Sequence, residues 1–382
     1  MHDDDVKTVS GAIKVARVLC ILCVVYMHPW IGVSGDELFA SPHFWDKFLI
    51  YWTQEAVARS AVPLLSVVSG WLVLSTVQRK VYGDFINGKA RAILLPMLIW
   101  NVIALAVVSV FAGFGFLAKI MPQSPIEALN ELVFLYERGA INVQNSFLRD
   151  LFVCMLVAPF LIRLSPRWLW ALLITSVVWQ LSEVQLYILL RPQILTFFII
   201  GILARASRWD RQVVRWPVLP ILAVAAVAIA LKVNLIMYPP DEPSLLVDGT
   251  LELALRISVA LAFWRMSVSL AQTRFLDLFK RIEPYTFLLF CSHVIIIRTI
   301  GPVLGQIFGK FGDPLFLPYY FAQPFIALFA AILLGLLLVR VSPTVAHVMS
   351  GGRLGAKARQ PREPRGRSAS EQGRAFPPLA GE

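Results

Sequence analysis

Charged residues are scarce in this sequence. Asp, Glu, Lys and Arg together make up 15% of its 382 residues, whereas hydrophobic residues make up 58%, and the mean hydropathy is +0.69. A water-soluble chain of this length could not bury so much apolar surface. We therefore predict an all-α polytopic membrane protein that has no separate soluble domain.

Acidic residues are fewer than basic ones, 24 against 35, which gives a formal net charge of +11. In a membrane protein such an excess usually lies in cytoplasmic loops, where it contacts anionic lipids. A cationic cleft for an anionic substrate is a second interpretation, and both can hold. No compact basic domain is expected outside the membrane part, so the pattern argues against a nucleic-acid partner.

Cysteine is also rare, with four residues, and all of them lie in apolar stretches. Cys20 and Cys23 form a C-x-x-C pattern within a predicted membrane helix, without a second pair, which favours packing over a redox or metal site. We predict no metal site. The amino-terminal residues are acidic and no small-residue cleavage site follows the first apolar run, so we expect that run to be retained as a membrane span.

Ten apolar runs are long enough to be candidate membrane helices. They are residues 13–33, 48–77, 92–117, 146–164, 168–184, 187–204, 217–237, 250–270, 285–308 and 321–341. We expect them to form one helical bundle over residues 13–341, preceded by a short cytoplasmic segment, 1–12. Residues 342–382 are rich in Gly, Pro, Ser and Arg, which predicts a disordered basic cytoplasmic tail.

The loops between these runs alternate in charge. Those after the second, fourth, sixth and eighth runs are rich in Lys and Arg, and the others are poor in them. The positive-inside rule then places both termini in the cytoplasm, in a multi-pass protein of the plasma (inner) membrane. Ser69 and Gly70, within the second run, predict a close helix contact or a kink.

The first run contains two unusual residues, Arg17 and His28. They are 11 positions apart, which places them on nearly the same face of a continuous α-helix, roughly 16 Å apart along its axis. Ionisable residues within a bilayer are costly, so they normally face a cavity or the bundle interior. Arg17 has the alternative role of an anchor that reaches to lipid phosphate.

The Arg17-x10-His28 spacing resembles the start of the acyltransferase-3 family of membrane-bound O-acyltransferases. Further stretches resemble that family's pattern in the same order. They are Val62-Pro-Leu-Leu-Ser-Val-Val-Ser-Gly-Trp71, Lys89-Ala-Arg91-Ala-Ile-Leu-Leu-Pro96, Phe147-Leu-Arg-Asp-Leu-Phe152, Phe197-Phe-Ile-Ile-Gly201 and Tyr285-Thr-Phe-Leu-Leu-Phe-Cys-Ser-His293. The resemblance covers about residues 12–340.

The resemblance implies an enzyme that transfers an acetyl or succinyl group from cytoplasmic acyl-CoA to a hydroxyl of an extracytoplasmic glycan or lipid-linked sugar. Membrane lipids and the polysaccharide-synthesis machinery would be its partners. Acyl transfer to a hydroxyl needs a general base and a donor that stabilises the oxyanion. His28 is the candidate base, and His293 is the second candidate. The alternative for His293 is a structural role, as a buried histidine bonded to a backbone carbonyl. Arg17, Lys89 and Arg91 are candidates for binding the CoA phosphates, and anchoring is the alternative for Lys89 and Arg91.

Four further charged residues are candidates for binding the acceptor. Glu55 and Arg59 are four positions apart in the second run, and a plain helical ion pair is the alternative. Arg149 and Asp150 begin the fourth run, where they would either bind sugar hydroxyls or cap the helix. Lys232 and Arg298 are expected to reach towards the membrane surface.

Two other functions remain open from the sequence. A secondary transporter or exporter of a lipid-linked or anionic solute would also need intramembrane charges, although the two similar halves typical of such proteins are not visible. A structural factor for polysaccharide assembly makes no use of Arg17 and His28. The acceptor, the acyl group and the existence of an acyl-enzyme intermediate are left undetermined.

Overall fold

A computed structural model describes residues 3–114, 117, 120–182, 184–241 and 244–355, and these residues form helices and no strand. The first half of the chain contains α1 (Asp3–Val25), α2 (Gly35–Ala40), α3 (Phe44–Tyr51), the π-helical segment η1 (Trp52–Ala58), α4 (Arg59–Val77), α5 (Tyr82–Lys89), the π-helical segment η2 (Ala90–Leu94), α6 (Leu95–Gly113), α7 (Pro125–Val133) and the 3₁₀ segment η4 (Val143–Asn145). The second half contains α8 (Ser146–Leu161), α9 (Pro166–Leu181), α10 (Pro192–Ala206), α11 (Trp209–Arg215), α12 (Val218–Met237), α13 (Leu245–Ala271), α14 (Leu276–Phe308), α15 (Phe316–Val341) and α16 (Pro343–Met349). The prediction of an all-α protein is confirmed for these residues.

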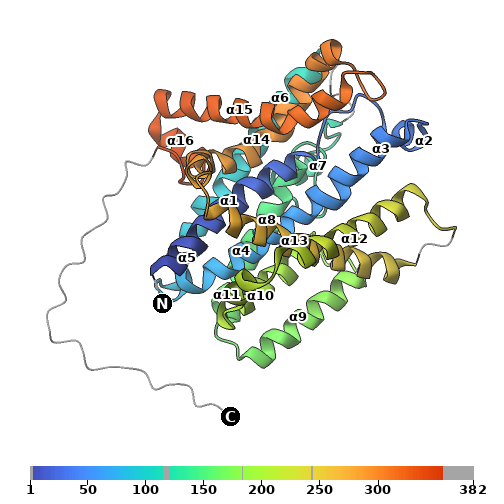
Figure 1. The fold of residues 1–382 in the computed structure, drawn as a ribbon. Coiled ribbons are helices and arrows are strands. Elements are labelled where there is room, and N and C mark those ends of the chain that lie inside the picture. Colours follow the sequence, from blue (N-terminus) through green and yellow to red (C-terminus); the bar gives the residue numbers. More distant parts are fainter. Residues whose placement is uncertain (1–2, 115–116, 118–119, 183, 242–243, 356–382) are drawn as a thin grey trace, which may run out of the picture.

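The long helices pack side by side and run between two ends of a bundle (Figure 1). We call the end at which α1 begins the basic end, because Lys80, Lys89, Arg205 and Arg215 lie in or beside its loops. The start of α1 lies at that end, together with α5 and α11, whereas α2 lies at the far end (Figure 1). Since α16 packs on α6, the described carboxyl-terminal part also lies at the basic end.

Six helical stretches of the described chain are long and apolar enough to cross a membrane. They are Lys7–Val25, Phe44–Val77, Tyr82–Gly113, Val218–Met237, Leu276–Phe308 and Phe316–Val341. Four more helices occupy the other predicted spans: α8, α9 and α10 have only 15 or 16 residues, and α13 has 27 but carries several charges. A polytopic membrane protein is therefore supported, and the number of ten spans stays a prediction.

The first helix differs from the prediction at both ends. It begins at Asp3, so most of the segment 1–12 is helical, and it ends at Val25 rather than reaching residue 33. Pro29 explains this end, because proline disfavours a helical conformation of the preceding residue and clashes with the carbonyl four residues earlier. The prediction that Arg17 and His28 share a face of one continuous helix is therefore wrong, and His28 lies in the turn after α1.

The predicted tail also needs a correction. Part of residues 342–382 forms α16, whose amino terminus is capped by the Ser342 side chain accepting a hydrogen bond from the Val345 N–H. The described chain continues to Gly355 and contacts the bundle, since Gly351 lies against the Ala92 carbonyl. Residues 356–382 of the predicted tail lie outside the described residues.

Two glycines allow α4 and α10 to touch along their backbones. A Cβ atom on Gly70 would collide with the carbonyl oxygen of Phe198, and one on Gly201 would collide with the carbonyl oxygen of Val67. Small residues permit this close approach of membrane helices. The close contact predicted from Ser69 and Gly70 is therefore confirmed.

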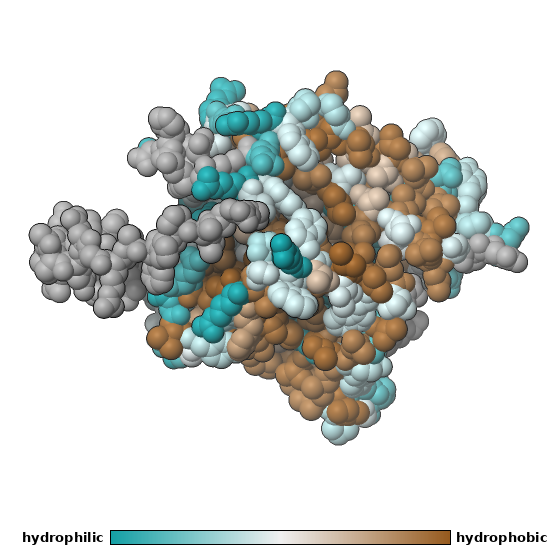
Figure 2. Space-filling view, turned by 90° about the horizontal axis from the view of Figure 1, so that it is seen from below, coloured by the Kyte–Doolittle hydropathy of each residue, from teal (hydrophilic) through white to brown (hydrophobic). Residues whose placement is uncertain are grey.

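The surface is consistent with a membrane environment. Seen from below, much of one face is apolar, and hydrophilic residues gather towards its margins (Figure 2). Large apolar side chains are exposed along α9, α12 and α15, among them Ile174, Leu219 and Phe329. Such contiguous apolar surface is unusual on a soluble monomer.

Candidate active site

A polar cavity of about 560 Å³ lies near the far end of the bundle, between the turn after α1 and helices α4, α9, α10 and α13. Its charged, imidazole and amide lining residues are His28, Arg59, Arg138, Gln180, Gln185, Arg191, Gln193, Asp248, Glu252 and Arg256. Of the residues predicted as site residues, the cavity lining includes His28 and Arg59. A polar space of this size within an apolar bundle is the best candidate for an acyl-transfer site.

The two histidines predicted as bases lie next to each other. The ring centroids of His28 and His293 are 5.6 Å apart, although the residues are far apart in sequence and belong to different elements. His28 is partly buried and lines the cavity, whereas His293, in the middle of α14, is fully buried. The structure therefore brings both candidate bases to one place.

Hydrogen bonding assigns the tautomer of His293. Its Nδ1 lies 3.1 Å from the Leu289 carbonyl oxygen and 2.9 Å from that of Phe290. Carbonyl oxygens only accept hydrogen bonds, so Nδ1 carries the proton and Nε2 has a free lone pair. Among the described residues, Nε2 is buried and has no hydrogen-bond partner. His293 thus has the backbone bond expected for a buried histidine and also a free basic nitrogen.

The turn that carries His28 is fixed by contacts with α14 and α15. The side chain of Gln323 accepts a hydrogen bond from the Trp30 N–H and donates one to the Trp30 carbonyl, each at 2.8 Å. The Trp30 ring packs so closely on Gly301 and Gly305 that a Cβ atom on either glycine would collide with it. These contacts hold Trp30, two positions after His28, and they limit where the His28 imidazole can lie.

A cluster of buried amides lies beside the helix turn that carries His293. Gln144 donates from Nε2 to the Cys291 carbonyl at 3.2 Å and to the Asn142 side chain. Asn101, on α6, accepts hydrogen bonds from the side chains of Asn142 and Asn145. The amide oxygens of Gln144 and Asn145 have no partner among the described residues. They are polar groups of this region that the sequence analysis did not identify.

The backbone at residues 140–141 is held from two sides. The carboxylate of Glu131 accepts hydrogen bonds from the Ala140 and Ile141 N–H groups, at 2.6 and 2.9 Å. Arg298 donates to the carbonyl oxygens of the same two residues, at 2.7 and 2.9 Å. Arg298 therefore binds the backbone of the loop before η4, rather than only reaching towards the membrane surface as expected.

The residues predicted to bind the donor lie outside the polar cavity, on the side towards the basic end. Arg17 forms an ion pair with Glu283 at 2.9 Å, and its side chain is 32% exposed. Lys89 lies over the ring of Phe85. Arg91 is exposed. None of these three residues is among the lining residues of the polar cavity.

The candidate acceptor-binding residues divide into two groups. Glu55 and Arg59 form an ion pair at 3.0 Å across the junction between η1 and α4, which is the alternative that the sequence offered. Arg59 also lines the cavity. Asp150 accepts hydrogen bonds from the Leu190 and Arg191 N–H groups, and Arg149 donates to Asp150 and to two carbonyls of the same loop. Arg149 and Asp150 therefore hold the loop between α9 and α10, and neither is among the lining residues of the cavity.

Three arginines of the cavity were missed by sequence reasoning: Arg138, Arg191 and Arg256. Arg256 lies within the predicted span 250–270, where the cost of burying a charge would have pointed to it. Arg138 and Arg191 lie in loops, and a sequence gives no sign of which loop residues turn into a cavity.

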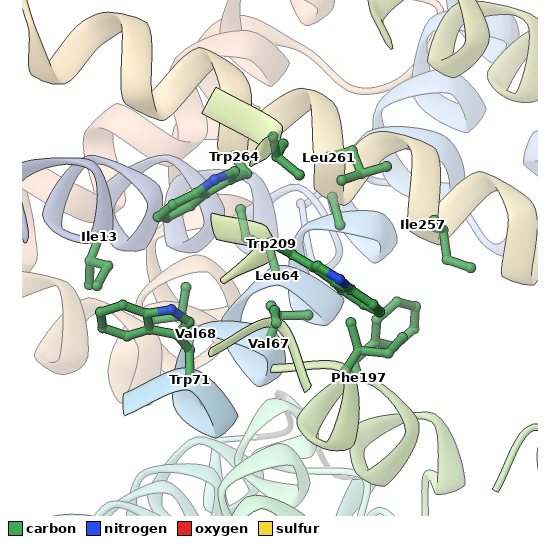
Figure 3. Close-up of a pocket in the computed structure, with 14 residues that line it drawn as sticks. Ile13, Leu64, Val67, Val68, Trp71, Phe197, Trp209, Ile257, Leu261 and Trp264 are labelled. Atoms are coloured by element: carbon green, nitrogen blue, oxygen red, sulfur yellow. The ribbon is translucent and has the colours of Figure 1, made fainter. Parts of the chain in front are cut away.

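A second pocket, of about 130 Å³, is apolar and lies nearer the basic end. Figure 3 shows the rings of Trp71, Trp209 and Trp264 around it, with Ile13 and Phe197. None of its lining residues is acidic, basic or a histidine, so it offers no group for acid–base chemistry. Within the described residues, no group of three or more His, Cys, Asp or Glu is placed to bind a metal ion.

Comparisons with known proteins give a family and one similar protein. A family model described as an acyltransferase domain matches residues 10–341. The succinoglycan biosynthesis protein ExoH of Rhizobium meliloti (strain 1021) is 29% identical over 371 residues, which cover 94% of this chain and 97% of that protein. No solved structure matches the chain significantly.

Proposed function

Since this chain belongs to the acyltransferase-3 family and is an acyltransferase, we propose that it moves an acetyl or succinyl group from cytoplasmic acyl-CoA to a hydroxyl of an extracytoplasmic or lipid-linked glycan. The similarity to a succinoglycan biosynthesis protein supports a glycan acceptor. The enzyme would lie in the plasma (inner) membrane with both termini in the cytoplasm, as the alternation of basic loops predicts.

The observation that carries this proposal is the proximity of His28 and His293 beside a polar cavity. In the proposed reaction, the acceptor hydroxyl oxygen attacks the thioester carbonyl carbon, and an imidazole takes the hydroxyl proton. The new C–O bond forms, the C–S bond breaks, and the proton passes from the imidazolium to the leaving thiolate. A neutral imidazole with a free lone pair is the group this step needs, and Nε2 of His293 has this form.

His28 and His293 have different environments, which suggests different roles. His28 lines the cavity and is the candidate for direct contact with the acceptor hydroxyl. His293 is fully buried, and its ring lies 5.6 Å from that of His28. It would accept a proton from His28 or orient the His28 ring.

The donor is proposed to enter from the basic end. Arg17 and Lys89 lie between that end and the cavity, and they carry cationic groups suited to the phosphates of CoA. Arg17 and Val25 are about 12 Å apart along α1, at 1.5 Å per residue. An extended thioester arm would have to cover this distance to bring its carbonyl to the histidines. The family membership favours this function over the transporter alternative.

The test uses a deletion strain complemented with wild type, His28→Ala or His293→Ala at matched membrane expression. Mass spectra of the glycans should show an acyl mass difference between the deletion strain and the wild-type complement, and both variants should resemble the deletion strain. Identical glycans in deletion and wild-type strains would reject the glycan acceptor. Wild-type acylation in both histidine variants would reject the proposed site.

A further inference from the structure

The polar cavity contains an unusual concentration of guanidinium groups. Arg59, Arg138, Arg191 and Arg256 line it from four separate elements: the start of α4, the loop after α7, the residue before α10, and the middle of α13. Against these four cations, the described lining residues include two carboxylates, Asp248 and Glu252. Asp248 contacts Lys232 instead of one of the four arginines.

Protein groups use only part of the hydrogen-bonding capacity of these arginines. Arg256 is 7% exposed and contacts Glu252 through Nη2, but its Nε and Nη1 have no partner among the described residues. Arg191 donates from Nη2 to Ser146, and its Nε has no partner there either. Arg59 contacts Glu55 through Nε.

Such an arrangement is costly without a ligand. Burying a cation whose N–H groups have no acceptor costs free energy, and like charges that face one cavity repel one another. The fold nevertheless holds one of them firmly, because Asp150 binds the backbone N–H of Arg191 at 2.9 Å. An anion that enters the cavity would offset the repulsion between these guanidinium groups, since guanidinium forks match the oxygens of phosphate and carboxylate groups.

We propose that this arginine cavity is a binding subsite for an oxyanion of the substrate, a phosphate or a carboxylate, held beside His28. The inference rests on the proposed function and deepens it. The oxyanion has two sources in that reaction: the phosphate or acidic sugar of a lipid-linked acceptor, or the free carboxylate of a dicarboxylic acyl group such as succinyl. In either case the subsite holds a charged end of the substrate while the reacting atoms lie at the histidines.

The test measures anion binding directly, without acyl transfer. The full-length protein is purified in detergent, and its thermal unfolding is followed with inorganic diphosphate, succinate or acetate, each compared with chloride at the same ionic strength. We expect diphosphate or succinate to raise the unfolding temperature, because a ligand that binds only the folded state stabilises it. Stabilisation by diphosphate indicates the acceptor phosphate, and stabilisation by succinate indicates a carboxylate.

Matched variants locate the effect. Arg256→Gln and Arg138→Gln should each weaken anion binding roughly tenfold to a hundredfold, the usual loss for a charge-assisted contact. Arg265→Gln is the control, because Arg265 lies on the same helix but donates to Trp216 and Ser269, outside the cavity. Arg138 is exposed in a loop, so its variant tests the proposal even if Arg256→Gln fails to fold.

Two results would overturn the subsite. One is that no probe stabilises the protein more than chloride does. The other is that Arg138→Gln keeps the anion affinity of the wild type, as the control Arg265→Gln is expected to do. Since acyl-CoA and acceptor are absent, these results do not depend on whether the protein acylates a glycan. A failure of the proposed function would instead appear in the glycan mass spectra, with anion binding unchanged.

Discussion

Gln323, on α15, binds both backbone groups of Trp30, accepting from its N–H and donating to its carbonyl at 2.8 Å each. This pair of hydrogen bonds connects α15 to the turn that carries His28, and Trp30 and Gln323 are 293 residues apart in sequence. The side chain is buried, at 3% exposure, so no water replaces it easily. Gln323 is therefore a positioning residue for the proposed base.

Gln323→Leu should lower both stability and acyl transfer. It leaves the Trp30 N–H and carbonyl without their partner, which costs about 1–3 kcal/mol for each buried group. Transfer should fall because the turn at His28 is no longer fixed. Thermal unfolding and acyl incorporation at matched expression measure the two effects. Gln306→Leu is the control, since Gln306 is exposed on α14. Full activity in Gln323→Leu would show that the turn holds His28 by other contacts.

The two histidines should act as one unit. His28→Gln and His293→Gln should each lower the transfer rate roughly 10²–10⁴-fold, the usual range for loss of a general base. The double variant should be no slower than the slower single variant, because residues that act together are not additive. His347→Gln, at an exposed position of α16, should keep wild-type rates. Multiplied losses in the double variant would mean that the two rings contribute independently.

Arg17→Ala should weaken the use of acyl-CoA. We expect roughly a tenfold rise in KM for the donor from loss of a charge-assisted contact, with little change in KM for the acceptor. The change also leaves Glu283 without its cation. Combining Arg17→Ala with Glu283→Gln separates the loss of the donor contact from the effect of an unpaired Glu283. Arg163→Ala is the control, because Arg163 is an exposed basic residue outside the proposed site. Unchanged dependence on acyl-CoA concentration in Arg17→Ala would identify Arg17 as an anchor.

Asp150→Asn should destabilise the loop between α9 and α10. The fully buried carboxylate accepts hydrogen bonds from two backbone N–H groups and from Arg149. An amide has only one acceptor oxygen, so it can replace only some of these hydrogen bonds. We expect about 1–3 kcal/mol lower stability, together with weaker anion binding because Arg191 is displaced. Asp241→Asn, in the exposed loop before α13, should change neither. Unfolding in denaturant and the anion-binding assay measure both quantities.

The sequence predicts the helices much better than it predicts the site. The length of each apolar run alone locates the long helices, because a helix that crosses the membrane needs enough apolar residues to cover the thickness of the hydrocarbon core. It misses the end of α1, although Pro29 carries that signal. The first candidate base, His28, was found through its spacing from Arg17, even though the two do not share one helix.

The rest of the cavity depends on contacts between distant parts of the chain. Whether His293 faces His28, or Arg191 turns inward, is decided by how α14 and α10 pack, and no local pattern encodes this. Arg149 and Asp150 are a further example. They lie in the first turns of α8, and their hydrogen bonds go to the neighbouring loop, which no local pattern indicates.

The contact between Gly70 and Phe198, and that between Gly201 and Val67, also limit how the protein can move. Helices whose backbones touch at two points collide when they slide or tilt against each other, so we expect α4 and α10 to move together. Arg59 begins α4 and Arg191 immediately precedes α10, so we expect the backbone at these two cavity residues to keep a nearly constant separation during turnover. We therefore expect any opening of the cavity to occur at the other wall, where α13 carries Arg256, and at the loop that carries Arg138.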